Sequence, residues 1–219
     1  MQPIVLTPAP HRQPAPNPLE KYYAFHAHIY NATRWSFLFG RTHLLQLARQ
    51  LQPSPTRILE IGCGTGRNLV RLARFFPQAE IIGVDLSTAM LAVARRQTAR
   101  YRSRITLVEG SYGNARSPVG HYDLVICSYA LTMFNPGFQN AVAAAHADLA
   151  AGGHFLLVDF HSTPWLWFAR WMRFNHVRMD GQLRPLLEST FTPVSNQVQS
   201  AYGGLWQFLL FAGKQKSAT

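Results

Sequence analysis

The middle of the chain alternates between short apolar runs and longer stretches with helical periodicity. Five runs have strand character, at 57–61, 80–84, 105–108, 122–127 and 154–160. Three stretches between them have the spacing of amphipathic helices, at 67–76, 88–100 and 138–149. This alternation predicts one parallel sheet that helices cover on both faces. Gly152-Gly153, after the third stretch, is expected to cap that helix.

The pattern changes after the fifth predicted strand. Thr163 as N-cap and Pro164 at the first helical position predict a further helix. Two extended runs follow, at 191–199 and 205–212, and Gly203-Gly204 lies between them. A glycine-centred join of this kind predicts a β-hairpin at the end of the chain.

The N-terminal part has a different composition. Residues 1–18 contain six prolines and few large apolar side chains, which predicts an extended, poorly ordered tail. Helical patterns run from 19 to about 39 and from 41 to 51, before Pro53 and Pro55. We therefore expect a tail over 1–18 and a single domain over 19–219, with 19–51 as a helical lid.

Composition limits the classes of protein to consider. The 219 residues suffice for one domain with a substantial core, and the net charge of +11 favours anionic partners: nucleic acid, an anionic lipid surface or a carboxylate-bearing substrate. A charge that only maintains solubility is the alternative. Cys63 and Cys127 have no disulfide setting, which agrees with a reducing cytosol, and no run of about 20 apolar residues predicts a membrane span.

One motif carries the chemistry. It reads Arg57-Ile-Leu-Glu60-Ile-Gly62-Cys63-Gly64-Thr65-Gly66, and Asp85 ends the next predicted strand nineteen residues later. Glycines in a strand-to-helix turn let the backbone approach a ligand, and an acid after the second strand binds ribose hydroxyls. A diphosphate gains nothing from Glu60, whereas a cationic sulfonium or ammonium does. A tight turn without any ligand is the alternative interpretation.

The motif resembles motif I of the class I S-adenosylmethionine-dependent methyltransferases. The resemblance implies a Rossmann-like α/β fold: a mostly parallel seven-stranded sheet with a C-terminal antiparallel hairpin and helices on both faces. It implies S-adenosyl-L-methionine as cofactor, with the methionine moiety over 62–66, Asp85 on the ribose and Leu86 and Met90 near the adenine. Ser111 stands where the family often has an acid, and Glu109 is a weak substitute. The implied cofactor-binding residues are Glu60, Gly62, Cys63, Gly64, Thr65, Gly66, Asp85, Leu86, Met90, Gly110, Ser111, Tyr112 and Ser128.

Two further segments have functional and ordinary interpretations. Four polar side chains share a helix face if the N-terminal helix is continuous: Tyr23, His26, Tyr30 and Arg34. They are either ordinary surface residues or part of a lid over the cofactor. Residues 161–178 interleave three Trp and two Phe with three Arg, which is consistent with a core helix or with an interfacial helix at lipid headgroups. No His, Cys or acid cluster has ligand spacing, so no metal site is expected.

Three segments are similar to the betaine-lipid N-methyltransferases: Tyr30 to Arg41, Ser128 to Phe134, and Tyr202 to Phe211. This resemblance implies three successive methylations of diacylglyceryl-homoserine to the trimethylhomoserine lipid. It also implies peripheral association with the anionic inner face of the membrane and, as a partner, the enzyme that makes the homoserine lipid. Asn31 departs from the family, which has Asp after the tyrosine.

Methylation of an amine requires a deprotonated nitrogen held in line with the methyl group. The candidates for accepting the proton or orienting the amine are Tyr23, Tyr30, Tyr129 and His161. The candidates for binding the substrate are His26, Arg34, Arg41, Met133 and Trp165, with Arg34 or Arg41 on the homoserine carboxylate. Aromatic faces would hold the growing methylammonium by cation–π attraction.

Two alternatives stay open at this point. One is methylation of phosphatidylethanolamine or of a soluble amine. The other, from a different class, is a basic nucleic-acid-binding protein. No helix-turn-helix, zinc or RNA-binding motif supports the second, so no nucleic acid is expected as partner.

Overall fold

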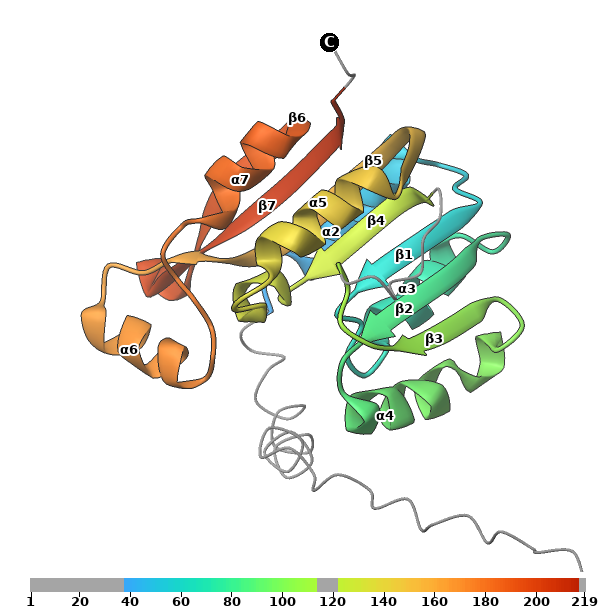
Figure 1. Ribbon diagram of the computed structural model, residues 1–219, viewed down its shortest axis with the longest axis horizontal. Coiled ribbons are helices and arrows are strands. Elements are labelled where there is room, and N and C mark those ends of the chain that lie inside the picture. The colour runs from blue at the N-terminus through green and yellow to red at the C-terminus, as the bar shows by residue number, and fades with distance from the viewer. Residues whose placement is uncertain (1–37, 114–121, 217–219) are drawn as a thin grey trace, which may run out of the picture.

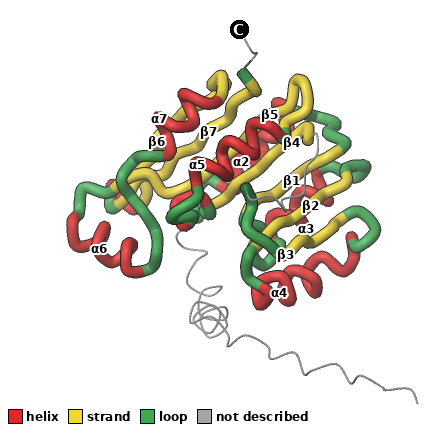
Figure 2. Tube along the Cα trace, viewed as in Figure 1, coloured by secondary structure: helices red, strands yellow, loops and turns green. Residues whose placement is uncertain are grey.

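The computed structural model describes residues 38–113 and 122–216, and they form one seven-stranded sheet with helices on both faces (Figures 1 and 2). The strands are β1 (Arg57–Ile61), β2 (Glu80–Asp85), β3 (Ile105–Glu109), β4 (Tyr122–Ser128), β5 (Leu149–Ser162), β6 (Phe191–Ala201) and β7 (Trp206–Gln215). Their order across the sheet is β3-β2-β1-β4-β5-β7-β6.

The first five strands are parallel, and β7 runs antiparallel to both β5 and β6. The fold class is therefore confirmed, including the C-terminal hairpin, whose strands the turn Tyr202–Gly204 joins. The strand order reverses at β1, because β2 lies on one side of it and β4 on the other. In open α/β sheets such a switch point opens a crevice at the carboxyl ends of the strands.

The helices divide between the two faces of the sheet (Figure 1). Their bounds are α2 (Arg41–Leu51), α3 (Arg67–Phe75), α4 (Thr88–Thr98), α5 (Phe138–Ala147), α6 (Leu166–Phe174) and α7 (Leu183–Thr190). Apolar residues of α2, α3, α4 and α6 pack in one buried cluster, and those of α5 and α7 pack in a second cluster on the opposite face.

The central strands supply both clusters because successive side chains of a strand point to opposite faces. In β4, Leu124 and Ile126 face the first cluster, whereas Val125 and Cys127 face the second. The buried apolar runs of the sequence therefore correspond to strands that are covered on both sides.

Two sequence predictions of helix ends are wrong. The helix before Gly152-Gly153 ends at Ala147, and the two glycines lie inside β5, where a Cβ on Gly153 would be 2.7 Å from the Tyr122 carbonyl oxygen. The glycines there permit a close approach of strands and do not cap a helix. The N-cap of α6 is Trp165, since the Thr163 hydroxyl accepts from the Trp165 N–H and donates to the Leu205 carbonyl.

The sequence analysis also missed α7, whose amphipathic stretch is only eight residues long. The predicted helix over 41–51 is confirmed as α2. The tail over 1–18 and the lid segment over 19–37 lie outside the described residues and stay predictions. In the described part of the chain, no helix is both long enough and apolar enough to cross a membrane.

Candidate active site

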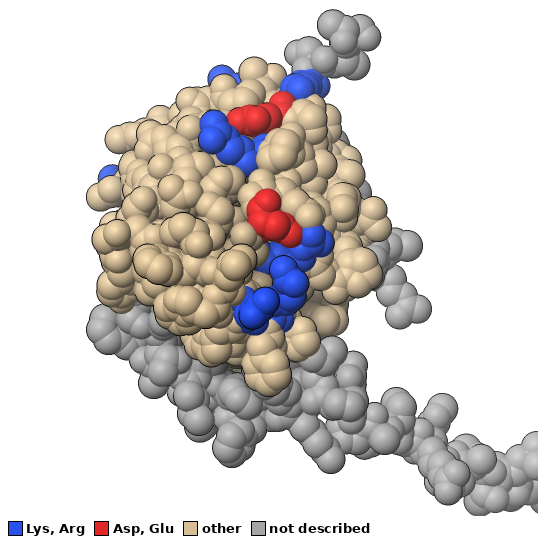
Figure 3. Space-filling view, turned by 90° about the vertical axis from the view of Figure 1, so that its left-hand side faces the viewer, with Lys and Arg blue, Asp and Glu red and all other residues tan. Residues whose placement is uncertain are grey.

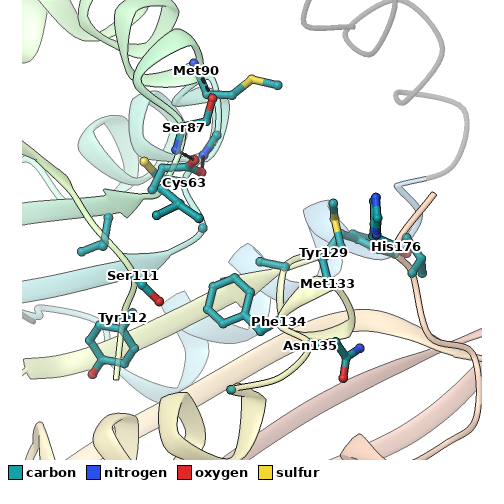
Figure 4. A pocket seen from close by; sticks show the side chains of 18 of the residues that line it. Cys63, Ser87, Met90, Ser111, Tyr112, Tyr129, Met133, Phe134, Asn135 and His176 are labelled. Atoms are coloured by element: carbon teal, nitrogen blue, oxygen red, sulfur yellow. Dashed lines mark hydrogen bonds between the residues drawn. The ribbon is translucent and has the colours of Figure 1, made fainter. Parts of the chain in front are cut away.

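A large cavity opens at the carboxyl ends of the parallel strands (Figure 4). Its volume is about 1970 Å³. Pockets for one drug-sized ligand span roughly 300–1,000 Å³, so this cavity has room for two ligands side by side. The glycine turn after β1 and the ends of β2 and β3 form one wall. The loop after β4, together with α6 and residues 176–180, forms the other wall.

The glycine turn is shaped by backbone conformations that favour glycine. Gly62, Gly64 and Gly66 all have positive φ, at 68°, 54° and 80°. Gly62 has no room for a side chain, because a Cβ there would lie 2.4 Å from the Ala130 Cβ. The turn therefore packs directly against the loop after β4 and exposes its backbone to the cavity.

Asp85 holds this turn in place from the end of β2. Its carboxylate accepts from the Gly64 N–H at 2.7 Å and from the Ser87 N–H at 2.9 Å. Ser87 is in turn the N-cap of α4, with its hydroxyl accepting from the Met90 N–H. Asp85 thus lines the cavity as predicted and also fixes the shape of its floor.

Glu60 lies beneath the turn and is 1% exposed. It shares the face of β1 that α2 and α3 cover, where Asn68 donates to its Oε1 at 2.8 Å. Among residues 38–113 and 122–216, its Oε2 has no hydrogen-bond partner. Burial raises the pKa of Glu60 to about 7, although Arg41 and Asn68 oppose the rise. A buried carboxylate of this kind gains strongly from a cationic ligand.

Arg41 begins α2 and reaches the same place. Its Nε donates to the Ser128 hydroxyl at 2.9 Å, and its side chain lines the cavity. Burial lowers the pKa of Arg41, while the charge of Glu60 opposes this. Ser128 lies behind Arg41 and is not among the residues that line the cavity. Arg41 therefore lies near the glycine turn, on the side predicted for the cofactor.

The predicted adenine side has an apolar surface. Leu86 is 71% exposed at the cavity wall, and Met90, which also lines the cavity, is buried. Gly110, Ser111 and Tyr112 line the neighbouring part. The Tyr112 hydroxyl donates to Asp148 at 2.6 Å, so the ring, and not the hydroxyl, is available to a ligand in the cavity. Glu109 accepts from the Thr88 hydroxyl at the rim.

Tyr129, Met133 and His176 form the opposite wall, across the cavity from Cys63, Ser87 and Met90 (Figure 4). Tyr129 adopts positive φ at 55°, and its hydroxyl donates to the Phe39 carbonyl at 2.8 Å. His176 also has positive φ, at 61°. Such conformations are rare outside glycine and concentrate at functional sites.

Asp159 supports this wall from β5, and the sequence analysis missed it. It is fully buried, and its carboxylate accepts from the backbone N–H groups of Ala130 and Thr132 and from the Thr132 hydroxyl. Burial raises the pKa of Asp159 to about 6, against these hydrogen bonds. A single acid inside an otherwise apolar strand was the available signal, because such a residue must find buried donors.

Besides Ser128, four candidates are not among the residues that line the cavity: Glu60, Gly66, His161 and Trp165. The His161 ring lies against Gly181, and burial lowers the pKa of His161. Trp165 is likewise absent from the lining and is 51% exposed. Successive side chains of a strand point to opposite faces, so the register of β5 decides whether His161 faces the cavity. Four more candidates lie outside the described residues: Tyr23, His26, Tyr30 and Arg34.

Residues that the sequence analysis did not select complete the second wall. They are Phe134, Asn135, Ala169, Arg173, His176, Val177 and Met179. Several follow α6 in the sequence, far from the glycine motif, and no local pattern marks them as part of a site. In the described part of the chain, no group of three His, Cys, Asp or Glu side chains could hold a metal ion.

Residues 58–153 match the profile of a methyltransferase domain family. Over these residues the chain is similar to methyltransferase domains. The profile covers β1 to the start of β5, and so it includes the glycine turn, Asp85 and the loop after β4. Residues 1–57 and 154–219, which include α6, lie outside the match.

Sequence relatives of the methyltransferase domain act on different acceptors. A demethylmenaquinone methyltransferase of Thermus thermophilus is 29% identical over 114 residues, which is 52% of this chain and 51% of that protein. A malonyl-[acyl-carrier protein] O-methyltransferase of Priestia megaterium is 31% identical over 144 residues, which is 65% of this chain and 51% of that protein. The matched region thus spans about half the length of each relative.

Solved structures share the fold across more of the chain. The Burkholderia thailandensis 1,6-didemethyltoxoflavin-N1-methyltransferase, solved with S-adenosylhomocysteine, has a TM-score of 0.66 at 17% identity and covers 95% of both chains. A Haemonchus contortus phosphoethanolamine N-methyltransferase has a TM-score of 0.70 at 18% identity over 90% of this chain and 58% of that one. The fold is that of the class I methyltransferases.

The cofactor wall fits S-adenosyl-L-methionine on its own geometry. Glu60 lies beneath this wall, with no hydrogen-bond partner for its Oε2 among the described residues, and Arg41 lines the cavity, so the two side chains could supply charges for the zwitterionic methionine end. Asp85 lies where ribose hydroxyls can donate to it, and the exposed Leu86 offers an apolar surface to a base. No diphosphate is needed to explain any of these groups.

Proposed function

We propose that this protein uses S-adenosyl-L-methionine to methylate the amine of a lipid headgroup. The acceptor that we propose is diacylglyceryl-homoserine, methylated three times to the trimethylhomoserine lipid. The observation that carries the proposal is a large cavity with two unlike walls. One wall is built for a nucleoside and a cation, and the other is formed in part by α6, whose outer side exposes tryptophan.

The cofactor wall positions the methyl donor. When bound, S-adenosyl-L-methionine supplies an electrophilic methyl group on a sulfonium. Glu60 would provide negative charge beneath the methionine end, and Arg41, which lines the cavity, would pair the methionine carboxylate. The sequence-based prediction was different: there, Arg34 or Arg41 binds the carboxylate of the homoserine acceptor.

The acceptor wall orients the amine. Because the Tyr129 hydroxyl donates its proton to the Phe39 carbonyl, its oxygen can act toward an amine only as a hydrogen-bond acceptor. Tyr129 would therefore hold an N–H and leave the nitrogen lone pair directed at the methyl group. Met133 and Phe134 provide apolar surface beside it, with the Phe134 ring available to a methylammonium.

Arg173 of α6 is the residue that we assign to the acceptor's carboxylate. It is exposed, lines the cavity and has no acidic partner among the described residues, whereas Arg178 is paired with Asp180. In neutral detergent micelles, Arg173→Ala should raise the KM for the homoserine lipid about tenfold, since a charge-assisted hydrogen bond is lost. Arg95→Ala, in α4 and outside the cavity lining, removes the same charge and should leave the KM unchanged.

The function itself is tested with labelled S-adenosyl-L-methionine. The full chain is incubated with lipids from a host that makes the homoserine lipid, and the products are separated by thin-layer chromatography. A labelled trimethylated homoserine lipid is the expected result, and an Asp85→Ala variant should give none. Label in phosphatidylethanolamine derivatives or in water-soluble amines alone would replace the proposed acceptor with those alternatives.

A further inference from the structure

The outer side of α6 exposes an unusual density of large apolar side chains. Trp165, Leu166, Trp167, Trp171 and Phe174, which we call the α6 aromatic face, are 51%, 76%, 61%, 49% and 79% exposed. Single exposed apolar residues are ordinary, but five within ten consecutive residues form a patch of the kind that marks a binding surface.

The helix is held firmly although its outer side is exposed. Phe168 and Met172 are buried, and the Phe168 ring stacks on Trp206 of β7 with centroids 5.7 Å apart and planes at 15°. A second side, with Ala169 and Arg173, lines the cavity. The α6 aromatic face is the third side, and it follows from helical spacing, since residues 167, 171 and 174 are three and four apart.

Charge indicates what covers this face. Residues 165–174 contain no acid, and Arg170 lies on the exposed side among the aromatics. In the view toward this side of the molecule, a broad uncharged surface borders basic side chains with some acidic side chains among them (Figure 3). Tryptophan beside arginine, with no acid, suits a bilayer surface, where indoles lie at headgroup depth and guanidinium groups meet lipid phosphates.

We propose that the α6 aromatic face docks on an anionic lipid bilayer, with Arg170 at the lipid phosphates. Because another side of the same helix lines the cavity, docking brings the cavity mouth to the headgroups. A lipid could then present its amine while its acyl chains stay in the bilayer. The purpose of this docking rests on the proposed function, but the docking itself is tested by vesicle binding alone.

The first test is co-sedimentation of the full chain with vesicles of phosphatidylcholine and phosphatidylglycerol. A variant with Trp167→Ser, Trp171→Ser and Phe174→Ser should bind with a partition coefficient about 100-fold lower, because three aromatic side chains no longer enter the interface. None of the three lines the cavity, so S-adenosylhomocysteine affinity should be unchanged, which shows that the variant is folded. The control Phe75→Ser with Val194→Ser, which alters exposed apolar residues elsewhere, should bind like the unchanged protein.

The second test follows tryptophan fluorescence with brominated lipids in the same vesicles. Three of the chain's five tryptophans lie on the α6 aromatic face and Trp206 is fully buried, so quenching should be strong and should disappear in the triple variant. Equal vesicle binding by the triple variant would overturn the proposal. A dimer that is held together by this face and does not bind vesicles would also overturn the proposal. Vesicle binding without any lipid methylation would leave the docking standing and would contradict the proposed function.

Discussion

At the scale of single residues, Glu60 is a buried carboxylate beneath the glycine turn. It lies in the central strand β1 with a single hydrogen-bond donor, from Asn68, and burial raises its pKa to about 7. Since the pKa is above the ordinary 4.5, its contribution to stability is fully present below pH 4.5 and is lost as the pH rises through about 7. A cationic ligand reverses this balance by stabilising the ionised form.

The affinity for S-adenosyl-L-methionine should therefore rise between pH 6 and pH 8, as Glu60 becomes ionised. Glu60→Gln should weaken binding about tenfold at pH 8 and remove most of the pH dependence, because a pKa shift of one unit corresponds to a tenfold change in affinity. Isothermal titration at several pH values measures both effects. Glu80→Gln changes an exposed acid at the start of β2 and should match the unchanged protein. An unchanged pH profile in Glu60→Gln would exclude this role.

At the scale of elements, the glycine turn and the loop after β4 depend on each other. Gly62 brings the turn against Ala130, and Asp159 holds that loop from behind by accepting from Ala130 and Thr132. The cofactor wall and the acceptor wall are thus joined through one small contact. Changes there are expected to affect both ligands.

Gly62→Ala and Gly64→Ala test this contact as a matched pair. Both glycines have positive φ, but only Gly62 lacks space for a Cβ, since nothing lies within 4 Å of a Cβ on Gly64. Gly64→Ala should lower the free energy of unfolding by about 1 kcal/mol, the strain of alanine in this conformation. Gly62→Ala should lower it by more than about 3 kcal/mol and weaken cofactor binding. Urea denaturation gives both values, and equal losses would contradict the packing argument.

Asp159→Ala should destabilise the protein by about 3 kcal/mol or more, because several buried donors lose their acceptor. Since the pKa of Asp159 is raised to about 6, its own contribution to stability decreases as the pH rises through 6, and the variant should lack this step. Thermal denaturation between pH 4 and pH 8 measures both. Thr132→Ala removes one donor of the network and should have a smaller effect. A larger loss in Thr132→Ala than in Asp159→Ala would contradict the assignment.

At the scale of the whole molecule, the net charge of +11 accompanies a sheet whose few acids are partly committed to internal contacts. Glu60, Asp85 and Asp159 hold the site, and Asp123 accepts from the backbone N–H groups of Thr56 and Arg57. The outer surface is therefore more basic than the composition alone implies. This favours an anionic surface as the place where the protein works.

Binding to anionic vesicles should consequently weaken about tenfold between 50 mM and 500 mM salt, as the ions screen exposed charges. Binding to neutral phosphatidylcholine vesicles, which rests on apolar contact, should change little over the same range. Sedimentation of the full chain at each salt concentration tests this. Salt-independent binding to anionic vesicles would mean that the basic surface has no part in it.

The fold could be predicted from the sequence to a large extent because its elements are defined locally. The run 57–61 is β1 to the residue, and the hairpin follows from its glycines. The cofactor side of the site was also predictable, since the turn and Asp85 lie within one β-α-β unit. The helix α7 could not be predicted because it is short. The true ends of α5 and α6 could not be predicted because strand pairing and a local hydroxyl contact override the capping signals there.

The acceptor side was decided by tertiary structure. Whether His161 reaches the cavity depends on the register of β5. Arg173 and His176 line the same cavity as the glycine turn because α6 packs on Trp206 and the chain then returns to the sheet. The sequence by itself predicted a cofactor with a cationic end and a nucleoside, because the residues assigned to those groups lie in one contiguous motif. What faces that cofactor, and which side of α6 is left exposed, depends on contacts between residues far apart in the sequence, such as Phe168 with Trp206 and Tyr129 with Phe39, and these exist only in the folded chain.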